Sequence, residues 1–475
     1  MRRSITRTAL AVIVIVIVVI VAVGAYVAYV KTKKPVTTTT SPTTTTSTPT
    51  TTPTPTTITT STSSTTTTST ITTSTSSTTT TTGPSQILIG VVYDSTGEFA
   101  TSSMPEYEGL ELWANWVNSH GGIYVKQYGR NLTVKIIALD AGSSAQTALS
   151  DYEQLVDVDH VNILVADFGS VMTAPAVSFT NSSHVLLWDV TGSSYAFFVN
   201  NNYIVLTSLP VSPYFVLYVP GFLYSLGIHN VAVIYDENDF NAYQSYFLAP
   251  GLKKYNISVI YNTSVPTSTS DYSSIIATLE SLHPQAVLEL GYPTNDIAFL
   301  NGLASAHACF PLVLTNFPGQ LLPTFVSQVG ANMNGTFTLA YPPIVAYTPQ
   351  LAQKLGLTWW GPTYQQFESM WVSTYHTPPN FLAIAGFNAG LIIQLAIEDA
   401  GTLNQTALKQ AVINDISGKI MTIDGIFNVT SNGMQVGENP IPAQVWVWPN
   451  GTTTVNLLYP ASFKNGTAVY PAPCP

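Results

Sequence analysis

The stretch Ile-Leu-Ile-Gly-Val-Val-Tyr at residues 87–93 is apolar throughout, and the turn-rich Asp-Ser-Thr-Gly follows it at 94–97. A strand that is apolar on both faces is typical of a parallel sheet that helices cover on both sides. Residues 105–118 then place apolar side chains at helical spacing, and Gly121-Gly122 ends that pattern. The segment therefore predicts the strand, turn and helix of an α/β fold.

The same alternation recurs along the chain in two successive series. Further strands are predicted at 133–139, 162–166, 185–188 and 202–206, and then at 231–235, 258–262, 286–290 and 312–315. Helices are predicted between them, at 145–156, 213–226, 241–255, 272–282 and 294–306. Two series predict two doubly wound parallel-sheet lobes. Ligands of open parallel sheets bind beyond the carboxyl ends of the strands, so two lobes that face one another there would form a cleft.

The charge distribution excludes several functions. Of the 475 residues only 8% are charged, and six of the 15 basic residues lie in residues 1–34. Nine basic residues therefore remain against 25 acidic ones, a formal net charge of −16 for the rest of the chain. Such a body is a poor partner for nucleic acid or an anionic membrane surface. It is also longer than one hydrophobic core usually grows, which favours two packed domains.

Residues 1–34 predict an N-terminal membrane anchor or signal. Residues 9–30 are uncharged and rich in Val and Ile, and as a helix they would be ~33 Å long, enough to cross a bilayer. Cleavage is the alternative, either near Gly24-Ala25 or before the apolar run, where Arg-Thr-Ala-Leu at 7–10 resembles archaeal prepilin-type signals. No Cys follows the apolar run, which excludes a bacterial-type lipoprotein anchor.

Residues 35–84 are almost entirely Thr, Ser and Pro, which predicts a disordered or extended stalk of the kind that is often O-glycosylated. The body beyond the stalk carries nine Asn-x-Ser/Thr sequons. They begin at Asn131, Asn181, Asn256, Asn262, Asn334, Asn404, Asn428, Asn450 and Asn465. We expect a glycoprotein at the cell surface, tethered through its N-terminal helix, with the body outside the cell.

The ordered segments of the body resemble the Leu/Ile/Val-binding family of ABC-transporter substrate-binding proteins, which have the type 1 periplasmic binding fold. The resemblance spans 86–460 and suggests an archaeal source. It is carried by ILIGVVYDSTGEFA (87–100), VNSHGGI (117–123), KIIALDAGSSAQTAL (135–149), VNILVADFGSVMTAPAV (161–177), VAVIYDENDF (231–240), AVLELGYPTND (286–296), AGFNAGLIIQLAIEDAGTLN (385–404), IDGIFNVTSNG (423–433) and VWVWPNG (445–451).

The resemblance implies how the chain divides and what it does. Lobe 1 would contain about 86–209 and 342–437, and lobe 2 about 210–341 and 438–460, followed by a tail at 461–475. Three crossings would form a hinge that closes the lobes on an amino acid or a related small molecule. The implied partner is an ABC permease. The alternatives from other classes are a sensory ectodomain and a structural surface protein.

The resemblance also places candidate ligand-binding residues in lobe 1. Ser170 lies where the family presents a hydroxyl and backbone N–H groups to a ligand carboxylate, although it could instead only cap the helix that follows. Thr191, Gly192 and Ser193 match the family's second ligand loop, with an ordinary glycine turn as the alternative. Ser102 falls where relatives have an aromatic residue.

In lobe 2 the candidates are Phe240 and Tyr292, which match aromatic residues that contact the ligand in relatives. Asn316 stands where the family has the acid that binds the ligand's ammonium group. Either Asp189 or Asp296 then supplies the missing charge, or the ligand is not a standard α-amino acid.

The remaining motifs predict neither catalysis nor a cofactor. No GxSxG, GxGxxG, P-loop, HExxH or EF-hand pattern occurs, and the histidines have no metal-ligand spacing. Cys309 and Cys474 could form a disulfide that ties the tail to lobe 2, or both could be unpaired. The low charge density suggests a surface suited to an acidic exterior, with little loss of stability between pH 6 and pH 3.

Overall fold

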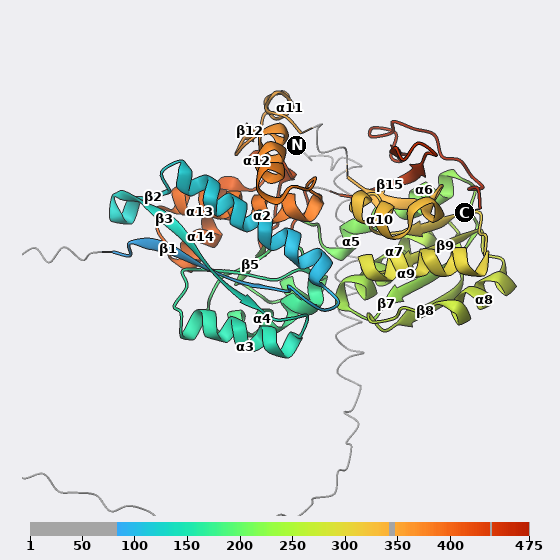
Figure 1. Cartoon of the computed structure of the whole chain (residues 1–475), viewed down its shortest axis with the longest axis horizontal. Helices are drawn as coiled ribbons and strands as arrows, with labels where there is room; N and C mark the ends of the chain where they lie inside the picture. The colour runs from blue at the N-terminus through green and yellow to red at the C-terminus, as the bar shows by residue number, and fades with distance from the viewer. Residues whose placement is uncertain (1–82, 342–346, 438, 475) are drawn as a thin grey trace, which may run out of the picture. The chain divides into compact units, whose positions relative to one another are not determined.

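The computed structural model describes residues 83–341, 347–437 and 439–474. The predicted anchor and all but the last two residues of the predicted stalk lie outside these residues. The described residues belong to one compact unit, Thr79–Pro475. Its core is organised around two large sheets, each with its own helices, which we call lobe 1 and lobe 2 (Figure 1).

Lobe 1 is built on a six-stranded sheet with the order β2-β3-β1-β4-β5-β6. The strands are β1 (Gln86–Tyr93), β2 (Ile123–Val125), β3 (Arg130–Asp140), β4 (Ile163–Val165), β5 (Leu187–Asp189) and β6 (Ile204–Leu206). All neighbours are parallel except β2 and β3. In the central strand, Ile89 is fully buried and pairs with Ile136 on one side and Ile163 on the other. The apolar run that opens the body is thus the centre of a covered parallel sheet.

The helices of lobe 1 follow its strands and return to it late in the chain. They are α2 (Ala100–Ser119), α3 (Ala145–Asp157), α4 (Gly169–Ser183), the short η2 (Tyr195–Phe198), α11 (Pro349–Lys354), α12 (Tyr364–Tyr375), α13 (Phe381–Ala400) and α14 (Gln405–Ala411). A small sheet of β12 (Thr358–Trp359), β13 (Ile420–Thr422) and β14 (Gly425–Phe427) accompanies the late helices.

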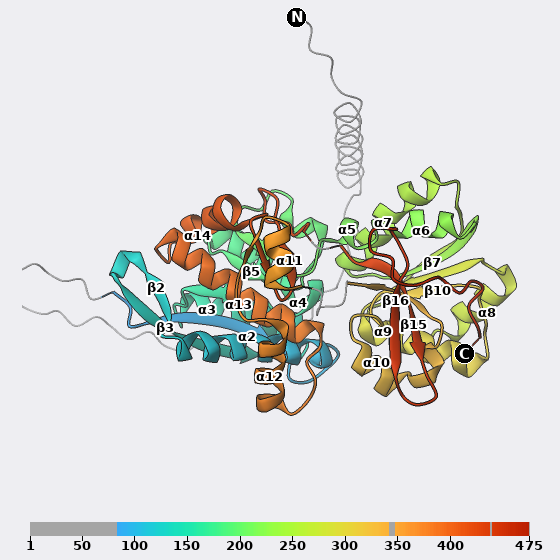
Figure 2. The same cartoon turned by 90° about the horizontal axis from the view of Figure 1, so that it is seen from above.

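Helix α13 is the central helix of this lobe and lies along α2 in both views (Figure 1 and Figure 2). Their backbones approach closely because glycines face the contact: a Cβ on Gly386 would lie 1.8 Å from the carbonyl oxygen of Glu106. Among the described residues, α13 alone is long and apolar enough to cross a membrane, but 89% of its most apolar stretch is buried. It is therefore a core helix.

Lobe 2 is built on a seven-stranded sheet with the order β16-β15-β11-β10-β9-β7-β8. Its strands are β7 (Asn230–Asp236), β8 (Ser258–Val265), β9 (Ala286–Leu290), β10 (Val313–Thr315), β11 (Phe337–Ala340), β15 (Ile441–Val447) and β16 (Thr453–Leu457). The first five strands are parallel, and β15 and β16 add an antiparallel edge (Figure 2). The predicted α/β fold with two parallel-sheet lobes is thus confirmed.

The helices of lobe 2 are α5 (Ser212–Phe215), α6 (Val219–Ser225), α7 (Asp239–Lys254), α8 (Ser273–Leu282), α9 (Pro293–Ala306) and α10 (Leu322–Gln328). The prediction of one helix over 213–226 is wrong, because the structure has α5 and α6 there. Pro220 has no N–H to donate to the carbonyl group of Val216, four residues earlier, so a continuous helix would lose that bond.

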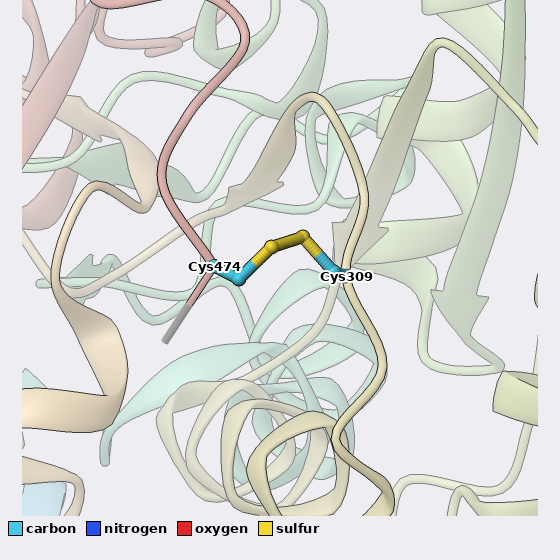
Figure 3. Close-up of a disulfide and its surroundings, with 2 residues drawn as sticks. All are labelled: Cys309 and Cys474. Atoms are coloured by element: carbon cyan, nitrogen blue, oxygen red, sulfur yellow. A yellow bond between two sulfur atoms is a disulfide. The ribbon is translucent and has the colours of Figure 1, made fainter.

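The C-terminal tail is tied to lobe 2 by a disulfide between Cys309 and Cys474 (Figure 3). The two Cα atoms are 5.3 Å apart, an ordinary spacing for a disulfide. Two hydrogen bonds join the same regions: Gln444 donates to the carbonyl oxygen of Val469, and the N–H of Ala472 donates to that of Pro311. Of the two alternatives for the cysteines, the structure has the paired one.

Candidate functional site

The loop after β4 leads directly into the first turn of α4. Gly169, the first residue of the helix, has φ +72°, a conformation that residues with a side chain rarely adopt. The N-cap is Phe168, which has no side chain able to accept the first-turn N–H groups. Ser170 is therefore not the cap of α4. The backbone N–H of Ser170 is instead bonded to an acceptor outside α4. This N–H lies in the first turn of the helix, where the partial positive charge of the helix terminus is strongest.

That acceptor is the hydroxyl of Tyr292 from lobe 2. The N–H of Ser170 donates to Tyr292 Oη at 2.8 Å, and both side chains are almost fully buried. Tyr292 is in turn the N-cap of α9, and its own N–H donates to Asp236 Oδ2 at 2.9 Å. Two residues predicted to bind a ligand from opposite lobes are thus brought together, but they contact each other directly.

The Tyr292 hydroxyl has the electrostatic environment expected of an acceptor at a helix terminus. Burial raises its pKa strongly, while the N–H and hydroxyl groups of Ser170 and the N–H of Val171 act in the opposite direction. The Ser170 hydroxyl itself is buried and has no hydrogen-bond partner of normal geometry. The first turn of α4 can therefore hold an oxygen atom of a ligand, but in this structure that position is filled by the tyrosine.

Aromatic rings from both lobes surround Tyr292. Phe240 of α7 stacks on it with ring centroids 6.2 Å apart and planes at 17°. Phe99 and Phe168 of lobe 1 each lie 5.9 Å from it, at 84° and 53°. The structure thus brings the predicted Phe240 and Tyr292 together and adds two rings that the sequence analysis did not single out. Both could have been found from their positions beside the strand-end loops.

The second predicted loop is occupied by contacts within lobe 1. Thr191 Oγ1 accepts from the N–H of Gly169 at 3.1 Å and donates to Glu106 Oε2 at 2.7 Å. Ser193 is fully buried, and its hydroxyl donates to the carbonyl oxygen of Thr191 at 3.3 Å. A Cβ on Gly192 would lie 2.5 Å from Thr173 Oγ1, so a residue with a side chain would not fit at this position without rearrangement. These residues support the α4 loop, and ligand binding by them stays a prediction.

Ser102 and Asn316 are both buried, one in each lobe. Ser102 is 6% exposed and lies in the first turn of α2. Asn316 is fully buried; its Nδ2 donates to the carbonyl oxygen of Gly291 at 3.1 Å, while its Oδ1 has no partner. The neutral amide is thus used to hold the loop that carries Tyr292.

The two acids considered as replacements for the family's acid are both fully buried within their own lobes. Asp189 Oδ1 accepts from the N–H of Gly192 at 2.7 Å, and burial raises the Asp189 pKa to about 7. Asp296 Oδ2 accepts from the N–H of Phe317 at 2.7 Å. Burial, opposed by hydrogen bonds, raises the pKa of Asp296 well above its usual range. Each carboxyl group therefore has a bond to the backbone of its own lobe.

Sequence reasoning missed two acids that are linked to Tyr292, one by a hydrogen bond and one through the ring of the residue next to it. Asp236 ends β7 and accepts from the N–H of Tyr292, and Glu98 directly precedes Phe99. Burial first, then Glu289 and Glu98, raise the pKa of Asp236. Their positions just beyond the carboxyl ends of β7 and β1 are the signal that could have identified them.

A chain whose two parallel-sheet lobes meet at their strand-end loops has the architecture of bilobal solute-binding proteins. A family model described as "Periplasmic binding protein" matches residues 86–436. The chain therefore belongs to the periplasmic binding protein family, whose Leu/Ile/Val-binding type I members are components of ABC transporters.

Solved structures agree on the fold. The leucine-binding protein LivK of Thermotoga maritima is similar at 16% identity and a TM-score of 0.67, covering 79% of this chain and 99% of that one. The isoleucine complex of LivJ from Streptococcus pneumoniae has 15% identity, a TM-score of 0.64 and coverages of 79% and 100%. A Rhodopseudomonas palustris solute-binding protein in complex with 3,4-dihydroxybenzoic acid has 14% identity, a TM-score of 0.65 and coverages of 82% and 99%.

Proposed function

We propose that this protein is an extracellular, membrane-tethered solute-binding protein of an ABC importer, which closes its lobes around an amino-acid-like or related small polar molecule. The contact between Ser170 and Tyr292 carries the proposal. It joins the strand-end loops of opposite lobes at a helix N-terminus, which is the chemistry that holds a polar ligand atom. Family membership and the ligands of the similar solved structures support the same function.

In this function the ligand enters when the lobes part and the Tyr292 hydroxyl leaves the first turn of α4. Closure then buries the ligand among the aromatic rings and the strand-end loops. The predicted hinge of three crossings provides the motion. The predicted anchor and stalk hold the body near a permease and raise its local concentration there. No chemical change of the ligand is required.

The Tyr292 hydroxyl fills the position at the first turn of α4 where a ligand atom would bind. This also favours a second candidate function, a structural surface protein that kept the fold without binding a solute. In that case the Tyr292 hydroxyl is a permanent replacement for a ligand atom, and the lobes stay in contact. The direct bond between Ser170 and Tyr292 is the observation that favours this reading. The two candidates make different predictions about lobe motion.

A thermal-shift screen of the full-length chain in detergent micelles tests the proposal. Amino acids, short peptides, amides, amines and organic acids are added singly, and each hit is examined by small-angle scattering. Binding with a change in radius of gyration supports the solute-binding function. A screen with no hit and an unchanged radius of gyration would instead support the structural candidate.

The Ser170→Ala variant tests the site within the same screen. Alanine keeps the backbone N–H but removes the hydroxyl that has no partner. If every hit kept its affinity in Ser170→Ala, the Ser170 hydroxyl would have no role in binding. Ser182→Ala, which removes an exposed hydroxyl near the other end of α4, is the matched control.

A further inference from the structure

The first turn of α4 is the place where a ligand carboxylate would be expected, and it is already satisfied. The Tyr292 hydroxyl accepts from the N–H of Ser170, and a Cβ on Gly169 would lie 3.2 Å from the same hydroxyl. A carboxylate could bind there only by displacing the tyrosine and its aromatic contacts. The chain thus supplies from its own lobe 2 the oxygen atom that a ligand carboxylate would provide.

Two carboxyl oxygens next to this tyrosine are buried without a hydrogen-bond partner. Asp236 Oδ2 is bonded to the N–H of Tyr292, but Asp236 Oδ1 has no partner, and Glu98 Oε1 has none either. The two side chains come from opposite lobes and flank Tyr292: Glu98 directly precedes Phe99, whose ring centroid lies 5.9 Å from that of Tyr292, and Asp236 accepts from the N–H of Tyr292. Among the described residues, no Lys or Arg makes a hydrogen bond to either carboxyl group. Asp236 is fully buried, whereas Glu98 is partly buried and only its Oε1 is enclosed. A buried acid without a partner is costly unless a cation or a proton compensates it.

A third unpartnered group lies at the hydroxyl end of the same tyrosine. The hydroxyl of Ser170 is 2% exposed, has no partner of normal geometry and lies beside the Tyr292 hydroxyl. Native proteins leave few buried polar groups unsatisfied, so such a group marks a position built for an additional polar contact. The position next to the Ser170 hydroxyl is bounded by Ser170 from lobe 1 and by Tyr292 from lobe 2.

The walls of the position are aromatic. The rings of Phe99, Phe168 and Phe240 lie 5.9, 5.9 and 6.2 Å from the Tyr292 ring, measured between centroids. Aromatic faces combined with carboxylates are the chemistry that recognises an organic cation, because the ring quadrupole and the negative charge both attract it. A carboxylate ligand would meet the two acids instead, and like charges repel.

We propose that the interlobe site takes a small organic amine that lacks a carboxylate, with its cationic nitrogen between Glu98 and Asp236 and its apolar part among the aromatic rings. The inference rests on the proposed solute-binding function and narrows its ligand class. It also accounts for Asn316, since the ammonium group is held by acids at other positions and the amide is free to support the Tyr292 loop.

Three matched compounds separate the amine from the carboxylate. They are leucine, 3-methylbutylamine, which is leucine without the carboxylate, and 4-methylpentanoate, which is leucine without the ammonium group. Isothermal titration of the full-length chain in detergent micelles should give at least 10-fold tighter binding of the amine than of leucine, and no binding of the acid. Tetramethylammonium, which has a positive charge but no N–H group, is a fourth compound. If it binds, the aromatic rings supply the larger share of the binding free energy of the cation.

Variants at the two acids test the assignment of the nitrogen. Glu98→Gln and Asp236→Asn should each weaken amine binding by about 10-fold or more, the loss expected for a charge-assisted hydrogen bond. Asn at 236 can still accept from the N–H of Tyr292, and circular dichroism checks that the variant folds. Glu237→Gln, an exposed neighbour bonded to Ser264, removes the same charge and should leave the affinity unchanged.

The outcomes distinguish this inference from the proposed function. Tighter binding of leucine or of 4-methylpentanoate than of the amine would overturn the inference while leaving a solute-binding protein. Unchanged amine affinity in both acid variants would also overturn it. The proposed function itself fails only if no compound of the wider screen binds and the lobes do not move.

Discussion

Asp94 and Asp167 are two buried acids of lobe 1 that Ser103 links: the N–H of Asp94 donates to Ser103 Oγ at 2.8 Å, and that hydroxyl donates to Asp167 Oδ1. The Oδ2 atom of each acid is buried and has no hydrogen-bond partner. Two ionised carboxylates in this buried cluster would repel each other, which favours the protonated form of one of them. Burial, followed by repulsion from Asp94, raises the pKa of Asp167 well above its usual range. Glu289 and Asp296 are a second pair of buried acids, in lobe 2, where burial, followed by repulsion from Asp296, raises the pKa of Glu289.

These pairs predict a body that is more stable in acid than at neutral pH. A carboxyl group whose pKa is raised by folding contributes stability that is fully present below the unfolded pKa of ~4 and is lost as pH rises through the folded pKa. The melting temperature of the full-length chain should therefore fall as pH rises from 4 to 7. A melting temperature that rises over this range would contradict the prediction, as would a large stability loss between pH 6 and pH 3.

The Asp167→Asn variant tests whether the lobe 1 pair causes this dependence. An amide at 167 can donate to the ionised Asp94, so the variant should show a shallower decrease of melting temperature between pH 4 and pH 7. Asp271→Asn is the control, since Asp271 lies on an exposed loop and its pKa is lowered by bonds from Ser273. An equal slope in wild type and Asp167→Asn would remove the pair as the cause.

The Tyr292→Phe variant tests the contact between the lobes. Loss of the hydroxyl removes its bond to the N–H of Ser170 and leaves that donor buried, which should destabilise lobe contact by about 1–3 kcal/mol. The radius of gyration of the unliganded full-length chain should therefore increase. The same variant should bind 4-methylpentanoate better than wild type does, because the first turn of α4 then lacks an acceptor.

Tyr364→Phe is the matched control for Tyr292→Phe. Its hydroxyl donates to Glu368 within α12, away from the contact of the lobes. If both variants scatter as wild type does, the bond between Ser170 and Tyr292 does not hold the lobes together.

The Cys309→Ser and Cys474→Ser variants should release the C-terminal tail. A disulfide that spans 165 residues stabilises the folded chain by about 5 kcal/mol in the chain-entropy model. Each single variant, and the double variant, should lose a similar amount of stability, measured by chemical unfolding. Limited proteolysis should then remove residues after about 460. Equal stability of wild type with and without a reductant would contradict this expectation.

The Gly386→Ala variant tests the packing of α13 on α2. A Cβ at 386 would lie 1.8 Å from the carbonyl oxygen of Glu106, so the two backbones must separate, at a cost of about 1–3 kcal/mol or more. Gly302→Ala in α9 is the matched control, because its Cβ would meet the flexible end of Ile276 at 3.1 Å and Tyr272 Cβ at an ordinary contact distance of 3.9 Å. That variant should be neutral or slightly stabilising. Equal melting temperatures for the two variants would count against a packing role of Gly386.

Much of the fold could be predicted from local patterns. Apolar strands such as 87–93 are buried on both faces, and the alternation with helices leaves few topologies open. The break between α5 and α6 was missed because Pro220 acts on a carbonyl group one turn earlier, within a segment that is otherwise periodic.

The candidate site was harder to predict because it depends on contacts between distant residues. Ser170 could be placed because the loop that contains it resembles the family's ligand loop. That Thr191 is bonded to Glu106, and that Tyr292 reaches the N–H of Ser170, depends on how separate elements pack. Glu98 and Asp236 lie 138 positions apart, and neither was singled out within the segments 87–100 and 231–240 that contain them.

The disulfide has a consequence for the order of events during biosynthesis. Cys474 follows β16, which is the last strand along the chain, so its sulfur reaches Cys309 only after the strands of both sheets have been made. Oxidation therefore cannot guide the early assembly of either sheet. The disulfide therefore forms last and stabilises a chain that has already folded. A truncated polypeptide that lacks Cys474 would keep a free thiol at Cys309, by which it could be recognised.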